Sequence, residues 1–192
     1  MSIRKIALLA VVAGAGVANA APTTYDIEPH HTYPSFEADH MGGMSVWRGK
    51  FNTSSGVVHI DRAAHSGDLS IVVDTASVNF GFDKMDEHAR SPDIFDVAKY
   101  PTATYKGTFS KWNGDSPTEV QGELTMHGVT KPVTLVINSF TCRVNPMIKK
   151  EVCGADAKAS LNRADYGINF GDKFGFKMDV NLLISVEAVK AD

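Results

Sequence analysis

The sequence predicts an all-β protein, a single extended antiparallel barrel of about eight strands with one or two short helices. Apolar and polar residues alternate with a period of two over most of the chain, as in strands with one buried face. The last of these runs would extend about 50 Å at about 3.3 Å per residue. Strands of that length suit a tall closed barrel, whose single sheet has no exposed edge.

The first 20 residues have the pattern of a secretory signal. Arg4 and Lys5 precede an apolar run from Ile6 to Val17, and residues 18–20 (Ala-Asn-Ala) have the small-x-small spacing at which signal peptidases cleave. The apolar run is too short to cross about 30 Å of hydrocarbon. We therefore expect a cleaved signal peptide over 1–20, export to the periplasm, and one mature domain over 21–192.

The charge balance of the mature domain excludes some classes of partner. Without Arg4 and Lys5, 17 basic residues stand against 22 acidic ones, a formal charge of −5 on 172 residues. A nucleic-acid partner would require a basic face that displaces phosphate counterions. Adhesion to anionic lipid head groups would also require positive charge. The sequence therefore predicts neither.

Six runs of alternating residues account for most of the predicted strands. They cover residues 55–60, 69–73, 102–109, 120–127, 133–140 and 176–188, and turn-forming residues such as those at 65–68 and 114–117 separate them. In the last run, with Leu183 as an exception, the apolar side chains share one face: Phe176, Met178, Val180, Leu182, Ile184, Val186 and Ala188. A barrel of this size encloses either packed side chains or one elongated ligand.

One helix is predicted over residues 82–94, where the alternation stops. Asp83 can cap its N-terminus, while the negative charges of Asp86 and Glu87 in the first turn interact favourably with the helix dipole. Pro92 ends the helix or begins a second short one. We expect this helix to lie beside an opening of the barrel.

Cys142 and Cys153 are the two cysteines of the chain. In an exported protein, two thiols at this separation are expected to form a structural disulfide that closes a hairpin tip, stabilising the fold by about 3 kcal/mol. The alternatives, a redox pair or a soft-metal site, lack the Cys-x-x-Cys spacing.

The segment 83–101 concentrates charged side chains around His88 and could be read as an active site. The chain has no Gly-x-Ser-x-Gly elbow and no glycine-rich oxyanion loop, so we predict no catalytic residue. We instead interpret His88, Arg90 and Asp93 as a polar brace that ties the helix to neighbouring strands.

The seven histidines suggest neither a metal site nor a haem site. They are His30, His31, His40, His59, His65, His88 and His127. No His-Glu-x-x-His or similar pattern fixes a coordination geometry, and no single axial histidine stands out. We therefore expect no metal and no cofactor.

Four ordered motifs carry a resemblance to a known family. They are Tyr25–His31, Phe36 with His40–Gly43, Asp86–Pro101 and Leu124–Val133. Together they resemble the YceI-like family of exported bacterial proteins, over essentially all of the mature chain. The resemblance implies a lipocalin-like barrel whose internal tunnel binds polyisoprenoid chains, including quinone-type lipids, or long fatty amides.

This chain departs from the family pattern at a few positions. Thr32 stands where a serine is usual, and Ile94 stands where the family often has a second phenylalanine. These departures are expected to reshape the pocket and leave the fold unchanged. The segment between Cys142 and Cys153 is a local elaboration, for which a role beyond stability is open.

Our leading hypothesis is a periplasmic protein that transports or sequesters a long isoprenoid lipid inside the barrel. We expect large apolar side chains on or beside inward faces to line the pocket: Phe36, Trp47, Phe51, Phe80, Phe95, Met126, Phe170, Phe174 and Met178. A second hypothesis is an adaptor for a membrane redox partner such as a b-type cytochrome, with lipid as structural filler. A third is an enzyme that acts on the bound lipid through His88 or His127. A homodimer around the barrel mouth is compatible with the sequence.

Overall fold

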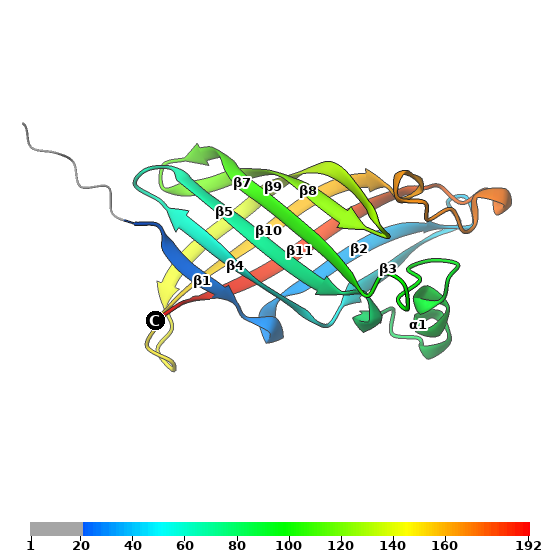
Figure 1. Cartoon of the computed structure of the whole chain (residues 1–192), viewed down its shortest axis with the longest axis horizontal. Coiled ribbons are helices and arrows are strands. Elements are labelled where there is room, and N and C mark those ends of the chain that lie inside the picture. The colour runs from blue at the N-terminus through cyan, green and yellow to red at the C-terminus, as the bar shows by residue number, and fades with distance from the viewer. Residues whose placement is uncertain (1–20) are drawn as a thin grey trace, which may run out of the picture.

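The computed structural model describes residues 21–192, so the signal peptide predicted over 1–20 lies outside the described residues. Eight strands close an antiparallel barrel, because β11 returns to pair with β1 (Figure 1). Around the barrel, the order is β1 (Thr23–Ile27), β4 (Ser54–Asp61), β5 (Ser66–Asp74), β7 (Thr102–Asn113), β8 (Ser116–Met126), β9 (Val129–Val144), β10 (Glu151–Asn162) and β11 (Asp179–Lys190). The predicted eight-stranded barrel is confirmed.

Three further strands extend the sheet from β11. They are β2 (Tyr33–His40), β3 (Ser45–Phe51) and β6 (Val78–Asn79), paired in that order. The edge of β11 that pairs with β1 near its C-terminal end pairs with β2 along its N-terminal half. The short 3-10 helix η1 (Pro29–His31) separates the two. The sequence patterns did not predict β2 and β3, because their apolar positions are few and interrupted by charged residues.

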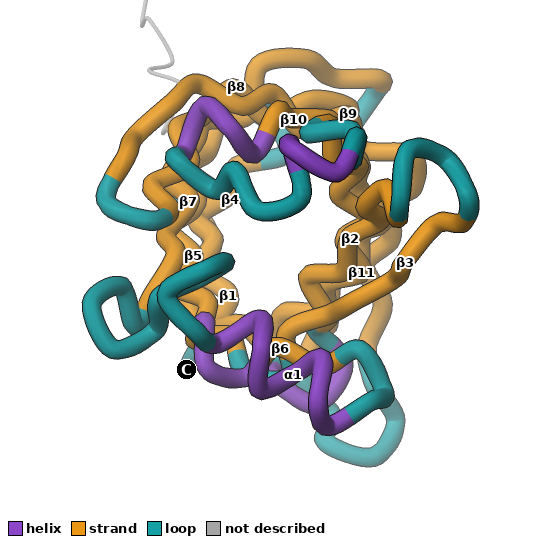
Figure 2. Tube along the Cα trace, turned by 90° about the vertical axis from the view of Figure 1, so that its right-hand side faces the viewer, coloured by secondary structure: helices purple, strands orange, loops and turns teal. Residues whose placement is uncertain are grey.

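The helical elements gather mainly at one end of the barrel. The α-helix α1 (Asp83–Arg90) and the 3-10 helices η3 (Arg163–Tyr166) and η4 (Asp172–Phe174) surround the barrel axis there, as Figure 2 shows. The 3-10 helix η2 (Thr75–Ser77) joins β5 to β6. None of the described helices is long and apolar enough to cross a membrane.

Helix α1 is shorter than predicted and begins differently. It spans eight residues, and the residue at its N-cap is Phe82, which offers no side-chain cap. Asp83 is therefore in the first turn instead of at the cap, and the chain after Arg90 continues through turns up to Tyr100. Asp86 provides the anchor, because its buried carboxylate accepts hydrogen bonds from the backbone N–H of Phe80 at 2.6 Å and from Nδ2 of Asn79 at 3.2 Å.

Strand β11 also begins later than the alternating pattern predicts. It starts at Asp179, whereas the apolar alternation starts at Phe176. The preceding segment leaves strand geometry because Gly171 and Gly175 flank η4 with φ of +90° and +79°, values that favour glycine. The long apolar face is therefore continuous only from Val180 to Ala188.

The disulfide predicted between Cys142 and Cys153 is confirmed. The two residues are direct partners in the β9–β10 register, near the hairpin that joins these strands. The bridge lies on the inner side of the hairpin, and Cys153 belongs to a buried cluster with Tyr25, Ile60 and Ala188. The disulfide thus packs into the barrel as well as stapling the hairpin.

Candidate functional site

A cavity of about 490 Å³ occupies the interior of the barrel. Its volume is in the range of small-molecule sites, and its wall is almost entirely apolar. Every barrel strand contributes inward-facing residues, and α1 and the segment 163–176 complete the wall at one end. The aliphatic part of the wall includes Ile27, Val58, Ile60, Leu69, Ile71, Val120, Leu124, Val133, Leu135, Ile137, Val180, Leu182, Ile184 and Val186.

The middle of the barrel is not filled by its own side chains. Ile71, Leu124, Leu182 and Ile184 all point inward, yet each is only half-buried. In a close-packed interior, such side chains would lose nearly all of their accessible surface. The inward face of the barrel therefore keeps apolar surface that no other part of residues 21–192 covers.

An aromatic cluster forms the wall near α1. The ring of Phe36 lies 5.7 Å from that of Phe51, 5.5 Å from that of Phe80 and 6.4 Å from that of Phe95, measured between centroids. Phe36 lies directly over Gly49, where a Cβ would sit 2.5 Å from the Phe36 ring. Glycine at this position thus allows Phe36, the most deeply buried ring of the cluster, to pack closely against β3.

Most residues predicted to line the pocket lie on the cavity wall. Seven of them are there: Phe36, Trp47, Phe51, Phe80, Phe95, Met126 and Phe170. Their contact with a ligand stays a prediction. The alternation of apolar and polar residues also points to further wall residues that were not among the predicted pocket residues. They include Tyr105, Phe176 and the inward aliphatic residues of β11. Met85 and Ile94 belong to the wall as well, and only the position of α1 reveals them.

The predictions for Phe174 and Met178 are wrong as to position. Phe174 is 71% exposed, because it lies on η4 between two glycines that reverse the chain and turn its ring toward solvent. Met178 precedes β11, so the alternation that places Val180 inside does not extend to it. Both errors arise where the sequence pattern continues past the end of a strand.

The polar groups in the wall are satisfied by the protein itself. The Tyr105 hydroxyl donates to the backbone oxygen of Val133 at 2.9 Å, and its ring covers Gly122. Burial raises the pKa of the Tyr105 phenol. The buried Thr32 hydroxyl donates to the backbone oxygen of Glu187 at 3.1 Å. A ligand inside the barrel would therefore meet apolar surface and few free polar groups.

One end of the cavity, here called the capped end, is densely packed. Tyr25, Ile60, Cys153 and Ala188 are each no more than 8% exposed there, and Trp112 packs against them. The Tyr25 hydroxyl donates to the carboxylate of Glu151. Burial and this hydrogen bond raise the pKa of Tyr25 to about 12.

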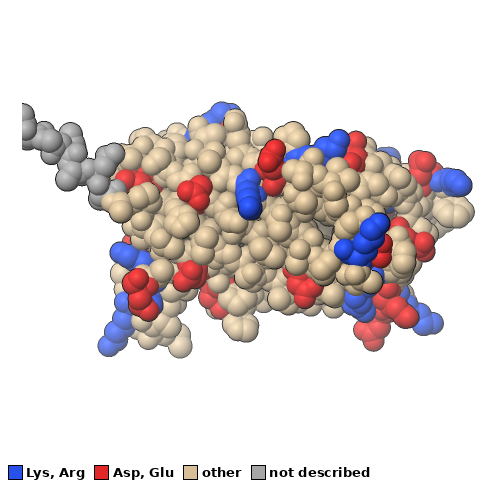
Figure 3. Space-filling model, viewed as in Figure 1, with Lys and Arg blue, Asp and Glu red and all other residues tan. Residues whose placement is uncertain are grey.

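The opposite end, here called the mouth, lies beside α1 and the segment 163–176. Phe170 is the most exposed of the cavity-lining residues, at 37%. Figure 3 shows the surface hollowed toward this end of the molecule. The Arg163 guanidinium lines the mouth and donates to the backbone oxygens of Ile168 and Phe170 at 3.0 and 2.7 Å, while burial lowers its pKa.

The predicted polar brace is present only in part. The Nε2 atom of His88 lies 3.3 Å from the carboxylate of Asp93, and the His88 ring meets the ring of Phe170 edge-on with centroids 4.6 Å apart. Within residues 21–192 no hydrogen bond or ion pair of the Arg90 side chain accompanies this contact, and the role of Arg90 in the brace stays a prediction. Asp86, which the sequence suggested only as a dipole partner, ties the helix to β6 and Phe80 instead.

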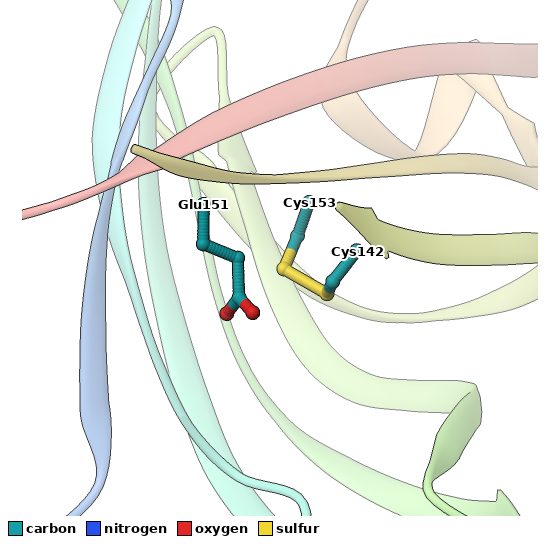
Figure 4. A group of neighbouring side chains, drawn as sticks. All are labelled: Cys142, Glu151 and Cys153. Atoms are coloured by element: carbon teal, nitrogen blue, oxygen red, sulfur yellow. A yellow bond between two sulfur atoms is a disulfide. The ribbon is translucent and has the colours of Figure 1, made fainter. Parts of the chain in front are cut away.

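Among residues 21–192, one group of side chains has the spacing of a metal site. It consists of Cys142, Glu151 and Cys153, which Figure 4 shows together. The two sulfur atoms are bonded to each other and are not thiolates, so they lack the charged form that metals bind. The expectation of no metal site stays a prediction.

The fold and the cavity define a class of protein, a small closed antiparallel barrel that encloses one long apolar cavity. The profile of the YceI-like domain matches residues 25–188, and the chain belongs to the YceI-like family. Relatives match nearly the whole chain. A UPF0312 protein of Pseudomonas aeruginosa is 34% identical over 190 residues, covering 98% of this chain and 97% of its own length. The protein YceI of Escherichia coli is 32% identical with the same coverage.

Solved structures share the fold. BcnA of Burkholderia cenocepacia superposes with a TM-score of 0.68 at 20% identity, covering 84% of this chain and 98% of that one. A YceI protein of Campylobacter jejuni superposes with a TM-score of 0.65 at 25% identity, covering 78% of this chain and 88% of that one. A polyisoprenoid-binding domain of Saccharophagus degradans superposes with a TM-score of 0.62 at 17% identity, covering 88% and 99%.

Proposed function

We propose that this protein binds a long isoprenoid lipid inside the barrel and carries or sequesters it in the periplasm. The lipid is of the polyprenol or quinone type, with a fatty amide as a further candidate. The observation that carries the proposal is the apolar cavity, which the protein's own side chains leave open and whose inward aliphatic side chains are only half-buried. The solved domain described as polyisoprenoid-binding supports the same class of ligand. The periplasmic location rests on the signal-like residues 1–20.

Apolar burial alone is sufficient to give such a ligand useful affinity. Each isoprene unit has about five carbons, so its burial contributes a gross transfer free energy of about 4 kcal/mol at about 0.8 kcal/mol per carbon. A few units offset the several kcal/mol that immobilisation costs. Binding of this kind requires no charged anchor and no catalytic group, which agrees with a binding protein more than with an enzyme.

The direct test identifies the ligand and then blocks its site. The protein is purified, extracted with organic solvent, and the extract is analysed by mass spectrometry for a co-purifying lipid. A protein that carries no lipid and takes up neither polyprenols nor quinones would contradict the proposal. Recovery of the lipid unchanged after long incubation would count against the enzyme hypothesis.

A pair of variants on β11 makes this test specific to the cavity. Ile184 points into the cavity, whereas its neighbour Leu183 faces outward and is 44% exposed. Ile184→Trp should fill the middle of the barrel and lower lipid uptake at least about tenfold, since a few buried carbons are worth that factor. Leu183→Trp adds the same ring on the outer face and should bind lipid as the wild type does.

The adaptor hypothesis predicts a different outcome for the same variants. A b-type cytochrome or another membrane partner that recognises the outer surface would still be recovered with Ile184→Trp. A pulldown from membranes with both variants therefore separates an adaptor, which keeps a stoichiometric partner, from a carrier, whose cavity is essential.

A further inference from the structure

Exposed large apolar side chains gather around the mouth of the barrel. Twelve such residues are exposed in the described part of the chain, and six of them belong to the mouth: Met41, Met44, Val46, Phe82, Phe170 and Phe174. We call these six the rim. Three others lie apart on the outer wall and three at the β9–β10 hairpin tip. Single exposed apolar residues are ordinary, whereas a cluster around one opening indicates a contact surface.

The three segments that carry the rim are held in contact with one another. The Asp39 carboxylate accepts hydrogen bonds from the backbone N–H of Gly42 at 2.9 Å and of Lys177 at 3.0 Å, which joins the β2–β3 turn to the segment after η4. The contact of His88 with Phe170 joins α1 to the same segment. Figure 2 shows these segments around the end of the barrel. The rim is therefore an assembled surface that keeps Met44 and Phe174 directed to solvent, 75% and 71% exposed.

The charges near the rim favour a partner without net charge. Residues 39–46, 82–90 and 163–177 together carry five basic and six acidic side chains, which Figure 3 shows intermixed toward this end. A balanced surface of this kind gains little from an anionic or a cationic partner. The hairpin tip at the other end differs, because Arg143, Lys149 and Lys150 accompany its exposed apolar residues.

We propose that the rim inserts into the surface of a zwitterionic phospholipid bilayer and places the mouth against the membrane. This inference rests on the proposed function, because an isoprenoid lipid is insoluble in water and must pass directly between the bilayer and the cavity. Methionine and phenylalanine side chains on loops can enter the boundary between head groups and acyl chains. Phe170, which is both a rim residue and a wall residue, continues the apolar surface from the bilayer into the cavity.

Sedimentation with phosphatidylcholine vesicles tests the proposal. Phe174→Ser and Met44→Ser remove exposed side chains that the cavity wall does not use. Each should lower the vesicle partition coefficient by about tenfold, because burial of one large apolar side chain is worth at least about that factor. Met147→Ser is the matched control, since Met147 is 88% exposed at the hairpin tip, at the opposite end of the barrel. The control should bind vesicles as the wild type does, with little dependence on salt.

A second measurement keeps this proposal separate from the proposed function. Binding of farnesol in vesicle-free buffer is followed by tryptophan fluorescence, because Trp47 lies on the cavity wall. Rim variants that lose vesicle binding and keep farnesol binding support the docking surface. Wild-type protein that binds vesicles and not farnesol would contradict the carrier function alone.

Three results would overturn the docking surface. The first is wild-type protein that does not bind the vesicles, or two rim variants that bind them as strongly as the wild type does. The second is a loss of vesicle binding in Met147→Ser, which would assign docking to the hairpin tip. The third is a dimer that light scattering detects in the wild type and not in the rim variants, which would assign the rim to a second copy of the chain.

Discussion

At the capped end of the barrel, strands are joined to one another by a disulfide and by buried side chains, whereas at the mouth they give way to a helix and loops. Tyr25, Glu151 and the Cys142–Cys153 bridge connect β1, β9 and β10 at the capped end. Single acidic residues, Asp86 and Asp39, hold the mouth segments. Local stability in a protein follows the density of such contacts. The capped end is therefore held by a covalent bond between strands, whereas the mouth depends on packing and on a few hydrogen bonds.

The disulfide should have the largest effect on stability. Replacing both Cys142 and Cys153 with alanine removes a constraint on the unfolded chain, and we expect a loss of about 3 kcal/mol in the free energy of unfolding. Urea denaturation of the oxidised wild type and of the double variant measures it. Lipid affinity should stay nearly unchanged, because the bridge belongs to the capped end. A large loss of affinity with an unchanged unfolding midpoint would reverse the roles assigned to the two ends.

Asp86→Ala should cause the second-largest loss of stability, and the loss should affect the mouth. The change leaves the backbone N–H of Phe80 and the amide of Asn79 without their acceptor, which costs about 2 kcal/mol for buried groups. Because α1 would be held less firmly, bound lipid should also exchange faster. Stopped-flow displacement of a fluorescent lipid measures the exchange. Asp83→Ala, on the exposed face of the same helix, is the control and should change neither quantity.

Ionisation of Tyr25 at the capped end should lower the free energy of unfolding at alkaline pH. Its pKa is raised to about 12 in the folded protein, so the folded state holds its proton more tightly than the unfolded state does. This contribution is fully present below the ordinary tyrosine pKa of about 10 and is lost as the pH rises through about 12. Unfolding free energies measured across this range should fall less steeply in Tyr25→Phe than in the wild type. Parallel curves for the two proteins would show that burial and the hydrogen bond to Glu151 do not raise the pKa of Tyr25 in solution.

Asp39→Ala should give the smallest effect, because this residue is partly exposed to solvent. Hydrogen bonds from the backbone N–H groups of Lys177 and Gly42 lower the pKa of Asp39. Its contribution is therefore present above its ordinary pKa and disappears as the pH falls through the lowered value. The variant should match the wild type in acid and be slightly less stable at neutral pH. Vesicle binding should weaken as well, since the β2–β3 turn and the segment after η4 would separate.

Much of the barrel could be predicted from periodicity alone. The alternating runs at 55–60, 69–73, 102–109 and 133–140 all fall within observed strands, since a sheet with one buried face imposes a period of two on its side chains. The same periodicity identified the inward face of β11 from Val180 to Ala188. The disulfide followed from the presence of two cysteines in a chain expected to be exported.

The candidate site was predictable where aromatic residues lie on strands or pack directly against them. Phe36, Phe80 and Phe95 were found because phenylalanine side chains are more often buried than exposed. Phe174 was misplaced because nothing in the alternation marks the point at which Gly171 and Gly175 reverse the chain. The anchoring role of Asp86 was not predicted for a related reason. A helix with many charges does not reveal which one is buried.

The sequence by itself determined the class of fold, the disulfide and the apolar character of the interior, because these depend on residue type and on local spacing. Only the tertiary structure decided that the interior is unfilled, that Tyr25 and the disulfide cap one end, and that the rim and Asp86 belong to the other. Those properties depend on distances between segments far apart in the chain, such as β1 with β11 and α1 with the loop at Phe170. The period of a strand states which side faces inward, and it carries no information on how much space remains there.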